Sequence, residues 1–313
     1  MRAQAGERLD DRAIVARQLR DAARSVARPS AWMGAARELA LSAFHIATYP
    51  LGIATADLAY EPATPRRVEP HPALLADPDA ADVPVVLVHG YFHNRSAFLI
   101  MTRALHRAGF RHVHGLNYNP LRHDCAELAA MLAIEVERVL DATGQQRCVL
   151  VGHSMGGIVA RLFAQELAAP GTVDTVVTLG SPHRGSYTAH LGFGPAAAEL
   201  RPRSRLLRRL EEGARPSGTR WIAYYSDLDL MVTPAVNAKL VHPAVEATNI
   251  ALRDTGHLSL LLSGEALRSV VDHLADRTMG WSGEHPRPLS PAAAGTGSGA
   301  GGGTARRHGP DPG

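Results

Sequence analysis

Continuous apolar runs alternate with stretches of helical periodicity through the middle of the 313-residue chain. The run at 83–88 carries no charge, which is typical of a strand buried on both faces. The stretch at 124–140 spaces its apolar residues as an amphipathic helix does. Such alternation predicts an α/β fold, a mostly parallel central sheet with helices on both faces. We expect strands at 83–88, 112–118, 148–152, 173–179, 221–225 and 245–250, and helices at 97–108, 124–140, 158–167 and 258–274.

The two ends of the chain depart from this alternation. Residues 7–28 are charged and helical in pattern, whereas proline and aspartate between 61 and 82 predict a linker. The last residues are rich in Pro, Gly and Ala and hold almost no apolar bulk, which predicts disorder. We therefore expect a helical extension over 1–60, a linker over 61–82, one α/β domain over 83–280 and a disordered tail over 281–313.

An uncharged segment runs from Leu39 to Ala56, close to the lower limit of about 18 residues for a membrane span. Its weak hydrophobicity and Pro50 favour a helix that covers the domain or touches a membrane surface. Two alternatives stay open: a transmembrane anchor, and a secretory signal that starts at Met33 and is cleaved after Ala56. The first interpretation predicts a cytoplasmic or membrane-associated protein, and the last predicts a secreted one.

Charge and cysteine content narrow the function classes. The net charge is only +3, and the arginines between 201 and 209 have no aromatic residues among them. This pattern favours a solvated helix face over a nucleic-acid patch, so we expect no nucleic-acid partner. The two cysteines cannot form a framework of disulfides, and Cys148 in a predicted strand indicates a buried free thiol.

The segment Gly152-His153-Ser154-Met155-Gly156-Gly157 lies between a predicted strand and a predicted helix. It has the G-x-S-x-G pattern of a nucleophile elbow, a sharp turn that exposes a serine above the sheet edge. Glycines are needed because the strained turn leaves no room for neighbouring side chains. Ser154 is thus a candidate nucleophile, and the Met155 N–H at the helix start is a candidate donor to an oxyanion.

A serine nucleophile needs a base, and the base needs an orienting acid. Asp227 and Asp229 both follow the predicted strand at 221–225. We favour Asp229, because the apolar segment and proline after it can fix its position, whereas Asp227 is more typical of a turn. His257 follows the last predicted strand and is preferred as the base over His242 and His273.

The loop after the first strand supplies further candidates. Gly90 lets the backbone turn, so the Tyr91 N–H is the expected second oxyanion donor. Phe92 and His153 are candidates for contact with substrate, whereas His89 is expected to make local hydrogen bonds. The histidines show no metal-ligand spacing, so neither a metal nor a cofactor is expected.

An insertion over 183–218 contains an amphipathic, arginine-bearing stretch at 200–210. It is either an ordinary surface excursion or a mobile cap or lid, and we favour the lid. In a lid, the apolar side chains of Leu206, Leu207 and Leu210 would face the site.

These pieces together resemble the bacterial triacylglycerol lipase and esterase family of the α/β-hydrolase superfamily. The resemblance rests on residues 84–90, 152–157 and 176–183, with Asp229 and Gly256-His257, and spans roughly 83–275. It implies the α/β-hydrolase fold, a Ser154–Asp229–His257 triad, oxyanion amides from Tyr91 and Met155, and hydrolysis of a lipid or small-molecule ester without a cofactor. An acyltransferase with the same triad and a catalytically silent binding module are the alternatives.

Overall fold

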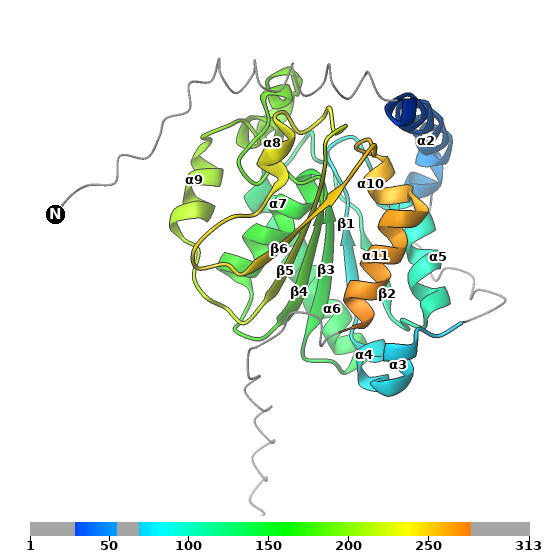
Figure 1. The fold of residues 1–313 in the computed structure, drawn as a ribbon. Helices are drawn as coiled ribbons and strands as arrows, with labels where there is room; N and C mark the ends of the chain where they lie inside the picture. Colours follow the sequence, from blue (N-terminus) through cyan, green and yellow to red (C-terminus); the bar gives the residue numbers. More distant parts are fainter. Residues whose placement is uncertain (1–28, 55–68, 277–313) are drawn as a thin grey trace, which may run out of the picture. The chain divides into compact units, whose positions relative to one another are not determined.

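The computed structural model describes residues 29–54 and 69–276, and its centre is a six-stranded sheet (Figure 1). The strand order is β2-β1-β3-β4-β5-β6, and every neighbouring pair is parallel. The carboxyl ends of all these strands therefore meet at one edge. The predicted strands are confirmed, with bounds at β1 Val85–Val88, β2 Val113–Leu116, β3 Cys148–His153, β4 Val173–Leu179, β5 Arg220–Ser226 and β6 Ala247–Leu252.

Helices cover both faces of this sheet, and each face has its own core (Figure 1). Alternate residues of one strand enter opposite cores, because side chains in a strand alternate between faces. In β1, for example, Val86 and Val88 belong to one core, whereas Val85 and Leu87 belong to the other. This explains the uninterrupted apolar runs. The first core packs against α6 (Cys125–Thr143) and α7 (Met155–Leu162), and the second against α5 (Leu99–Ala108) and α11 (Gly264–Ala275).

Helix boundaries follow from local capping chemistry. Helix α6 begins with a capping box between Asp124 and Glu127 and ends at Gly144, which has φ 68°. The helix expected at 258–274 is two helices, α10 (Ser259–Leu262) and α11, because the Ser263 side chain accepts a hydrogen bond from Ala266 N and starts α11. The remaining short helices are η1 Arg95–Phe98, η2 Phe163–Leu167, η3 Tyr187–Leu191, α8 Gly194–Glu199, α9 Arg205–Glu212 and η4 Ala235–Ala238.

The described part of the predicted linker is folded. Residues 69–82 contain α3 (Pro72–Ala76) and α4 (Pro78–Asp82), each with proline in its first turn, where the missing N–H costs nothing. Leu74 of α3 and two alanines of α4 are buried in the second core. These prolines therefore start helices and do not mark an extended linker, and in this stretch the linker prediction is wrong.

The uncharged segment at 39–56 falls largely within α2 (Pro29–Ala54), which contacts η1 and α10. No helix among the described residues has the length and apolarity that crossing a membrane requires. The helical pattern predicted at 7–28 and the tail predicted over 281–313 lie outside the described residues.

Both cysteines, Cys125 and Cys148, are buried free thiols, as predicted for Cys148. Burial raises the pKa of the Cys148 thiol to about 12, with a smaller contribution from the charge of Asp174. Burial also raises the pKa of Cys125 well above its usual value, and the nearby Glu199 carboxylate adds to the effect.

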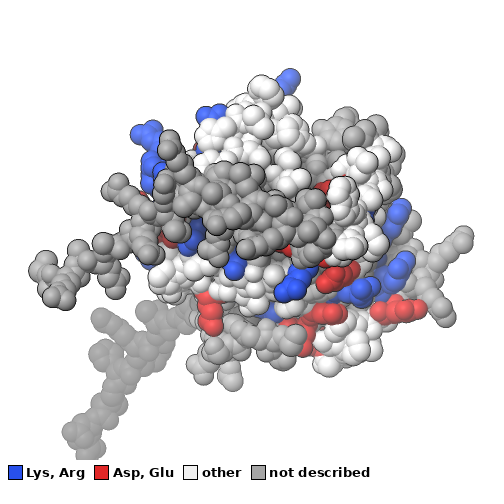
Figure 2. All heavy atoms as spheres, turned by 45° about the horizontal axis from the view of Figure 1, so that its top comes forward, with Lys and Arg blue, Asp and Glu red and all other residues white. Residues whose placement is uncertain are grey.

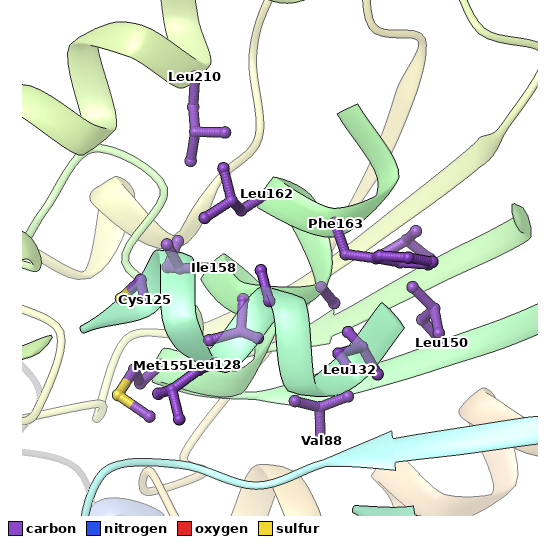
Figure 3. Close-up of a cluster of buried hydrophobic side chains, with 14 of the residues drawn as sticks. Val88, Cys125, Leu128, Leu132, Leu150, Met155, Ile158, Leu162, Phe163 and Leu210 are labelled. Atoms are coloured by element: carbon purple, nitrogen blue, oxygen red, sulfur yellow. The ribbon is translucent and has the colours of Figure 1, made fainter. Parts of the chain in front are cut away.

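Helix α9 packs its leucines into the first core. Leu206, Leu207 and Leu210 are buried there, and Leu210 points towards Leu162 of α7 (Figure 3). Leu206 and Leu207 therefore fill the interior, and this position gives no support to the expectation that they line a substrate site. The opposite face carries exposed arginines, as predicted: Arg205, Arg208 and Arg209.

Arg161 of α7 connects the elbow helix to α9. Its side chain is 0% exposed and donates to the carbonyls of Leu210 (3.1 Å) and His183 (3.5 Å). Glu211 lies 3.8 Å away, and Gln165 accepts from Nε. Burial lowers the Arg161 pKa to about 10, against the opposing charge of Glu211. The guanidinium therefore fastens the insertion to the domain.

We expect Arg161→Met to lower the free energy of unfolding by about 3 kcal/mol, because two buried carbonyls lose their donor. Urea denaturation followed by circular dichroism measures the change. The matched control is Arg138→Met, which removes an exposed arginine paired with the partly buried Glu135 on α6. That change should cost less than about 0.5 kcal/mol. Equal losses in the two variants would contradict a structural role for the buried arginine.

Candidate active site

The turn between β3 and α7 holds Ser154 in a rare backbone conformation. Its φ is 55° and its ψ is −124°, a region that non-glycine residues seldom occupy and that marks functional turns. Ser154 N donates to the Leu179 carbonyl at the end of β4 (2.8 Å), and Gly157 N donates to the Ser154 carbonyl (3.1 Å). These bonds hold the strained residue at the carboxyl edge of the sheet.

The glycines around Ser154 are required for steric reasons, as the motif predicts. A Cβ at Gly156 would overlap the carbonyl oxygen of Val88 in β1, and one at Gly152 would overlap the backbone of Gly157. The elbow helix therefore packs directly on the neighbouring strand. Met155, the first residue of α7, is fully buried beside it.

The structure brings Asp229 and His257 together. His257 Nδ1 and Asp229 Oδ2 are 2.8 Å apart, and the two residues are 7% and 2% exposed. The second carboxylate oxygen, Oδ1, accepts hydrogen bonds from Met231 N and Val232 N, both at 2.9 Å. Asp227 is exposed and accepts instead from Asp254 N (3.0 Å). Of the two candidate acids, only Asp229 is paired with the histidine.

The pKa of His257 reflects opposing effects. Burial lowers it, but the charge of Asp229 and the hydrogen bond that His257 donates to that carboxylate raise it, and the charge of Glu38 raises it further. The outcome is a pKa above the usual 6.5. Because Asp229 occupies Nδ1, the other ring nitrogen, Nε2, is the one through which this imidazole can exchange a proton.

His153, the residue before Ser154, connects the turn that carries Ser154 to the segment that carries His257. The His153 and His257 rings lie 4.6 Å apart, and His153 Nε2 is 3.1 Å from the His257 carbonyl oxygen. On its other side, His153 stacks on His93 at 5.1 Å. His153 is fully buried, so it packs between parts of the site. Phe92, by contrast, is 58% exposed. Substrate contact by either residue stays a prediction.

The loop after β1 approaches Ser154 at Gly90. A Cβ at Gly90 would lie 3.0 Å from the Ser154 Cβ, which is closer than ordinary van der Waals contact. Glycine avoids this close contact. The next residue, Tyr91, bonds through its hydroxyl to the backbone of Phe193 just before α8. His89 hydrogen-bonds locally with the Gly90 carbonyl, as expected, and it also stacks on Tyr118 and accepts from Tyr118 N in the segment after β2.

Sequence reasoning missed two residues at the site. Gly180 follows β4 with φ 57°, and a Cβ there would lie 2.8 Å from Asp229 Oδ2 and 3.1 Å from His257 Nδ1. Gly180 lies within the segment 176–183 on which the resemblance rests, but its contact with the Asp229–His257 pair was not predicted. Glu38 of α2 bonds to the two residues that follow His257, Leu258 and Ser259. No local pattern in the sequence indicates this contact.

Comparison with known proteins identifies the fold. A family model described as the alpha/beta hydrolase fold matches residues 83–190. The chain is 33% identical over 156 residues to a triacylglycerol lipase of Burkholderia plantarii, covering 47% of this chain and 40% of that protein. A triacylglycerol lipase of Pseudarthrobacter phenanthrenivorans is 48% identical over 54 residues, covering 17% of this chain and 16% of that protein. The matched segments thus span less than half the length of these relatives.

Solved structures agree with this result. The mature form of Bacillus licheniformis lipase BlEst2 superposes with a TM-score of 0.54 at 21% identity, covering 67% of this chain and 96% of that one. Aspergillus fumigatus lipase B gives a TM-score of 0.54 at 20% identity, covering 62% of this chain and 52% of that one. At this identity the likeness concerns the fold. The chain has the α/β-hydrolase fold, and its predicted resemblance to bacterial lipases and esterases is confirmed.

Proposed function

We propose that this protein is a serine hydrolase that cleaves carboxylic esters. The observation that carries the proposal is the buried Asp229–His257 pair beside a turn that holds Ser154 at a positive φ. Acid, base and nucleophile occur in the chain order of α/β-hydrolases, which is serine, then acid, then histidine. The triacylglycerol lipases that the chain resembles support the same reaction class.

The proposed reaction has two halves. Ser154 Oγ attacks the ester carbonyl carbon while His257 Nε2 takes the hydroxyl proton, and Asp229 stabilises the resulting imidazolium. The N–H groups of Met155 and Tyr91 donate to the oxyanion. Collapse of the intermediate breaks the bond to the alcohol oxygen, which takes the proton from His257, and leaves an acyl ester on Ser154.

Water completes the cycle. His257 removes a proton from water, the hydroxide attacks the acyl carbonyl, and the carboxylic acid leaves as the Ser154 oxygen recovers its proton from His257. Each half consumes and returns one proton at the same imidazole. The residues of this chain are sufficient for both halves.

An ester with an apolar acyl group suits the surface around the site. Large apolar side chains are exposed in the segments that follow β1, β4 and β5, among them Phe92, Leu191, Phe193, Leu230 and Met231. With the upper end of Figure 1 turned forward, the described surface in the upper part of the picture is mostly uncharged, whereas charged side chains gather across its middle and lower part (Figure 2). This distribution supports a lipid-like ester over a charged substrate.

A fluorophosphonate probe and a series of p-nitrophenyl esters test the proposal together. We expect the probe to modify Ser154, as located by mass spectrometry of the labelled peptide, and hydrolysis to rise from acetate towards longer acyl chains. Folded protein that neither reacts with the probe nor cleaves any ester of the series would contradict the proposal and favour a silent binding module. Acyl transfer to an added alcohol in preference to water would favour the acyltransferase.

A further inference from the structure

The carboxylate of Glu38 lies against the chain segment that carries His257. Its Oε1 accepts a hydrogen bond from Leu258 N (2.6 Å), and its Oε2 accepts two from Ser259, one from N (2.9 Å) and one from Oγ (2.7 Å). These donors belong to the two residues directly after His257. Glu38 comes from α2, 220 residues earlier than Leu258 in the chain.

The same carboxylate also lies against the residue before His257. A Cβ at Gly256 would overlap the Glu38 carboxyl group, so glycine is the residue that permits the contact. Glu38 therefore touches the backbone on both sides of the histidine. The N–H groups of Leu258 and Ser259 stand at the start of α10, where no helical carbonyl is available to them, and the carboxylate satisfies both.

A second contact from α2 reaches the same segment. Arg37 Nη2 donates to the Asp254 carbonyl oxygen (3.0 Å), three residues before His257. Asp254 itself has φ 50°, a conformation that needs support from its surroundings. Neighbouring residues of one helix thus hold the loop ahead of His257 and the helix start behind it.

We propose that Glu38 is a positioning residue for His257: α2 supplies the carboxylate that fixes residues 256–259 and so aims the imidazole at Ser154. The inference rests on the proposed ester hydrolysis for its kinetic consequence. It assigns a role in the site to a helix that lies outside residues 83–190, the part that matches the hydrolase family.

The electrostatics agree with this geometry. The groups that face the His257 imidazole are the Asp229 carboxylate at 2.8 Å, the Glu38 carboxylate through its charge, and the His153 ring at 4.6 Å. Burial lowers the pKa of His257, and the two carboxylates raise it. Removing the charge of Glu38 should therefore lower this pKa, whereas a purely structural contact far from the imidazole would leave it unchanged.

The test compares Glu38→Gln with Glu246→Gln in the full chain. The second variant removes the same charge from an exposed position after η4. For Glu38→Gln we expect kcat for p-nitrophenyl butyrate to fall about tenfold with KM nearly unchanged, since misaligning a bound group costs chiefly the chemical step. The acid limb of the pH profile should move to lower pH. Glu246→Gln should retain the wild-type kcat and pH profile.

Glu38→Asp separates the two contributions. Aspartate keeps the charge but is one methylene shorter. In Glu38→Asp the pKa of His257 should therefore return to the wild-type value, while kcat stays below wild type. Thermal unfolding of each variant identifies loss of fold. Either a wild-type kcat or an unchanged His257 titration in folded Glu38→Gln protein would overturn the proposal.

NMR titration of the His257 ring keeps this inference distinct from the proposed function. The resonance is assigned from its absence in His257→Gln, and its pKa is compared in wild type, Glu38→Gln and Glu246→Gln. If wild-type protein cleaves no ester, the proposed function fails, and the titration still decides whether Glu38 acts on His257. A lowered pKa in Glu38→Gln alone supports the role of Glu38, and equal pKa values in the three proteins exclude it.

Discussion

Replacing Ser154 with alanine is expected to lower kcat for p-nitrophenyl butyrate by about 10⁵-fold or more, because no other group can form the acyl-enzyme. The substitution removes only the hydroxyl oxygen. Alanine retains the Cβ that Ser154 already places next to Gly90, and the backbone bond to the Leu179 carbonyl involves no side-chain atom. The fold should therefore persist, and the loss should be confined to chemistry.

The matched control for this variant is Ser217→Ala, the same change at an exposed position before β5. It should leave kcat within about twofold of wild type, as surface changes usually do. Activity is followed by the absorbance of the released p-nitrophenol. Enzyme on the order of micromolar is needed to detect so low a residual rate. Retention of substantial activity in folded Ser154→Ala protein would remove the serine from the proposed mechanism.

Asp229→Asn is expected to lower kcat/KM by about 10⁴-fold, the scale on which a triad histidine loses activity when its carboxylate becomes an amide. The amide can keep accepting from Met231 N and Val232 N through its oxygen, so the loop should stay in place. Its nitrogen then faces His257 Nδ1 as a donor. This favours the tautomer that carries its proton on Nε2, which cannot accept the serine proton.

The pH dependence gives the same variant a second signature. His257 must be neutral to act as a base, so activity falls as pH drops through its pKa, which lies above 6.5 in the wild type. The charge of Asp229 favours the imidazolium. Without that charge, less opposes the effect of burial, and the pKa of His257 falls. The acid limb of the residual kcat/KM profile therefore moves to lower pH.

Asp227→Asn is the control for this pair of effects. Asp227 is exposed, stands two residues before Asp229 and accepts a hydrogen bond from Asp254 N. Its replacement should change kcat/KM by no more than a few-fold, because it does not face the imidazole. A larger loss from Asp227→Asn than from Asp229→Asn would reverse the assignment of the acid.

The strands were predictable because a buried parallel strand is mostly apolar: β1 is apolar along its whole length, and β3 is apolar up to Val151. Less was predictable where one residue type serves two purposes. Pro72 and Pro78 start helices, although prolines at that density also mark linkers. Ser263 divides the last helix by capping α11, which the apolar spacing of 258–274 does not indicate.

In the site, the residues close to a strand end could be predicted from the sequence. Asp229 and His257 each follow a strand, and the parallel topology brings those ends together. The contact made by Glu38 could not be predicted, because its partners lie more than 200 residues away in the chain. Its neighbours in sequence suggested a membrane contact instead. The leucines of α9 illustrate the same limit. An amphipathic helix predicts that one face is covered, but not whether the core or a substrate covers it.

The two buried thiols make this chain a convenient host for site-specific labels. Cys125 and Cys148 are both inaccessible, and the raised pKa of each keeps it protonated at neutral pH. A maleimide dye should therefore leave the wild-type protein unmodified. A single cysteine introduced at the exposed Leu191 would then carry the only fluorophore, and its emission would report whether the segment between η3 and α8 moves when an ester binds.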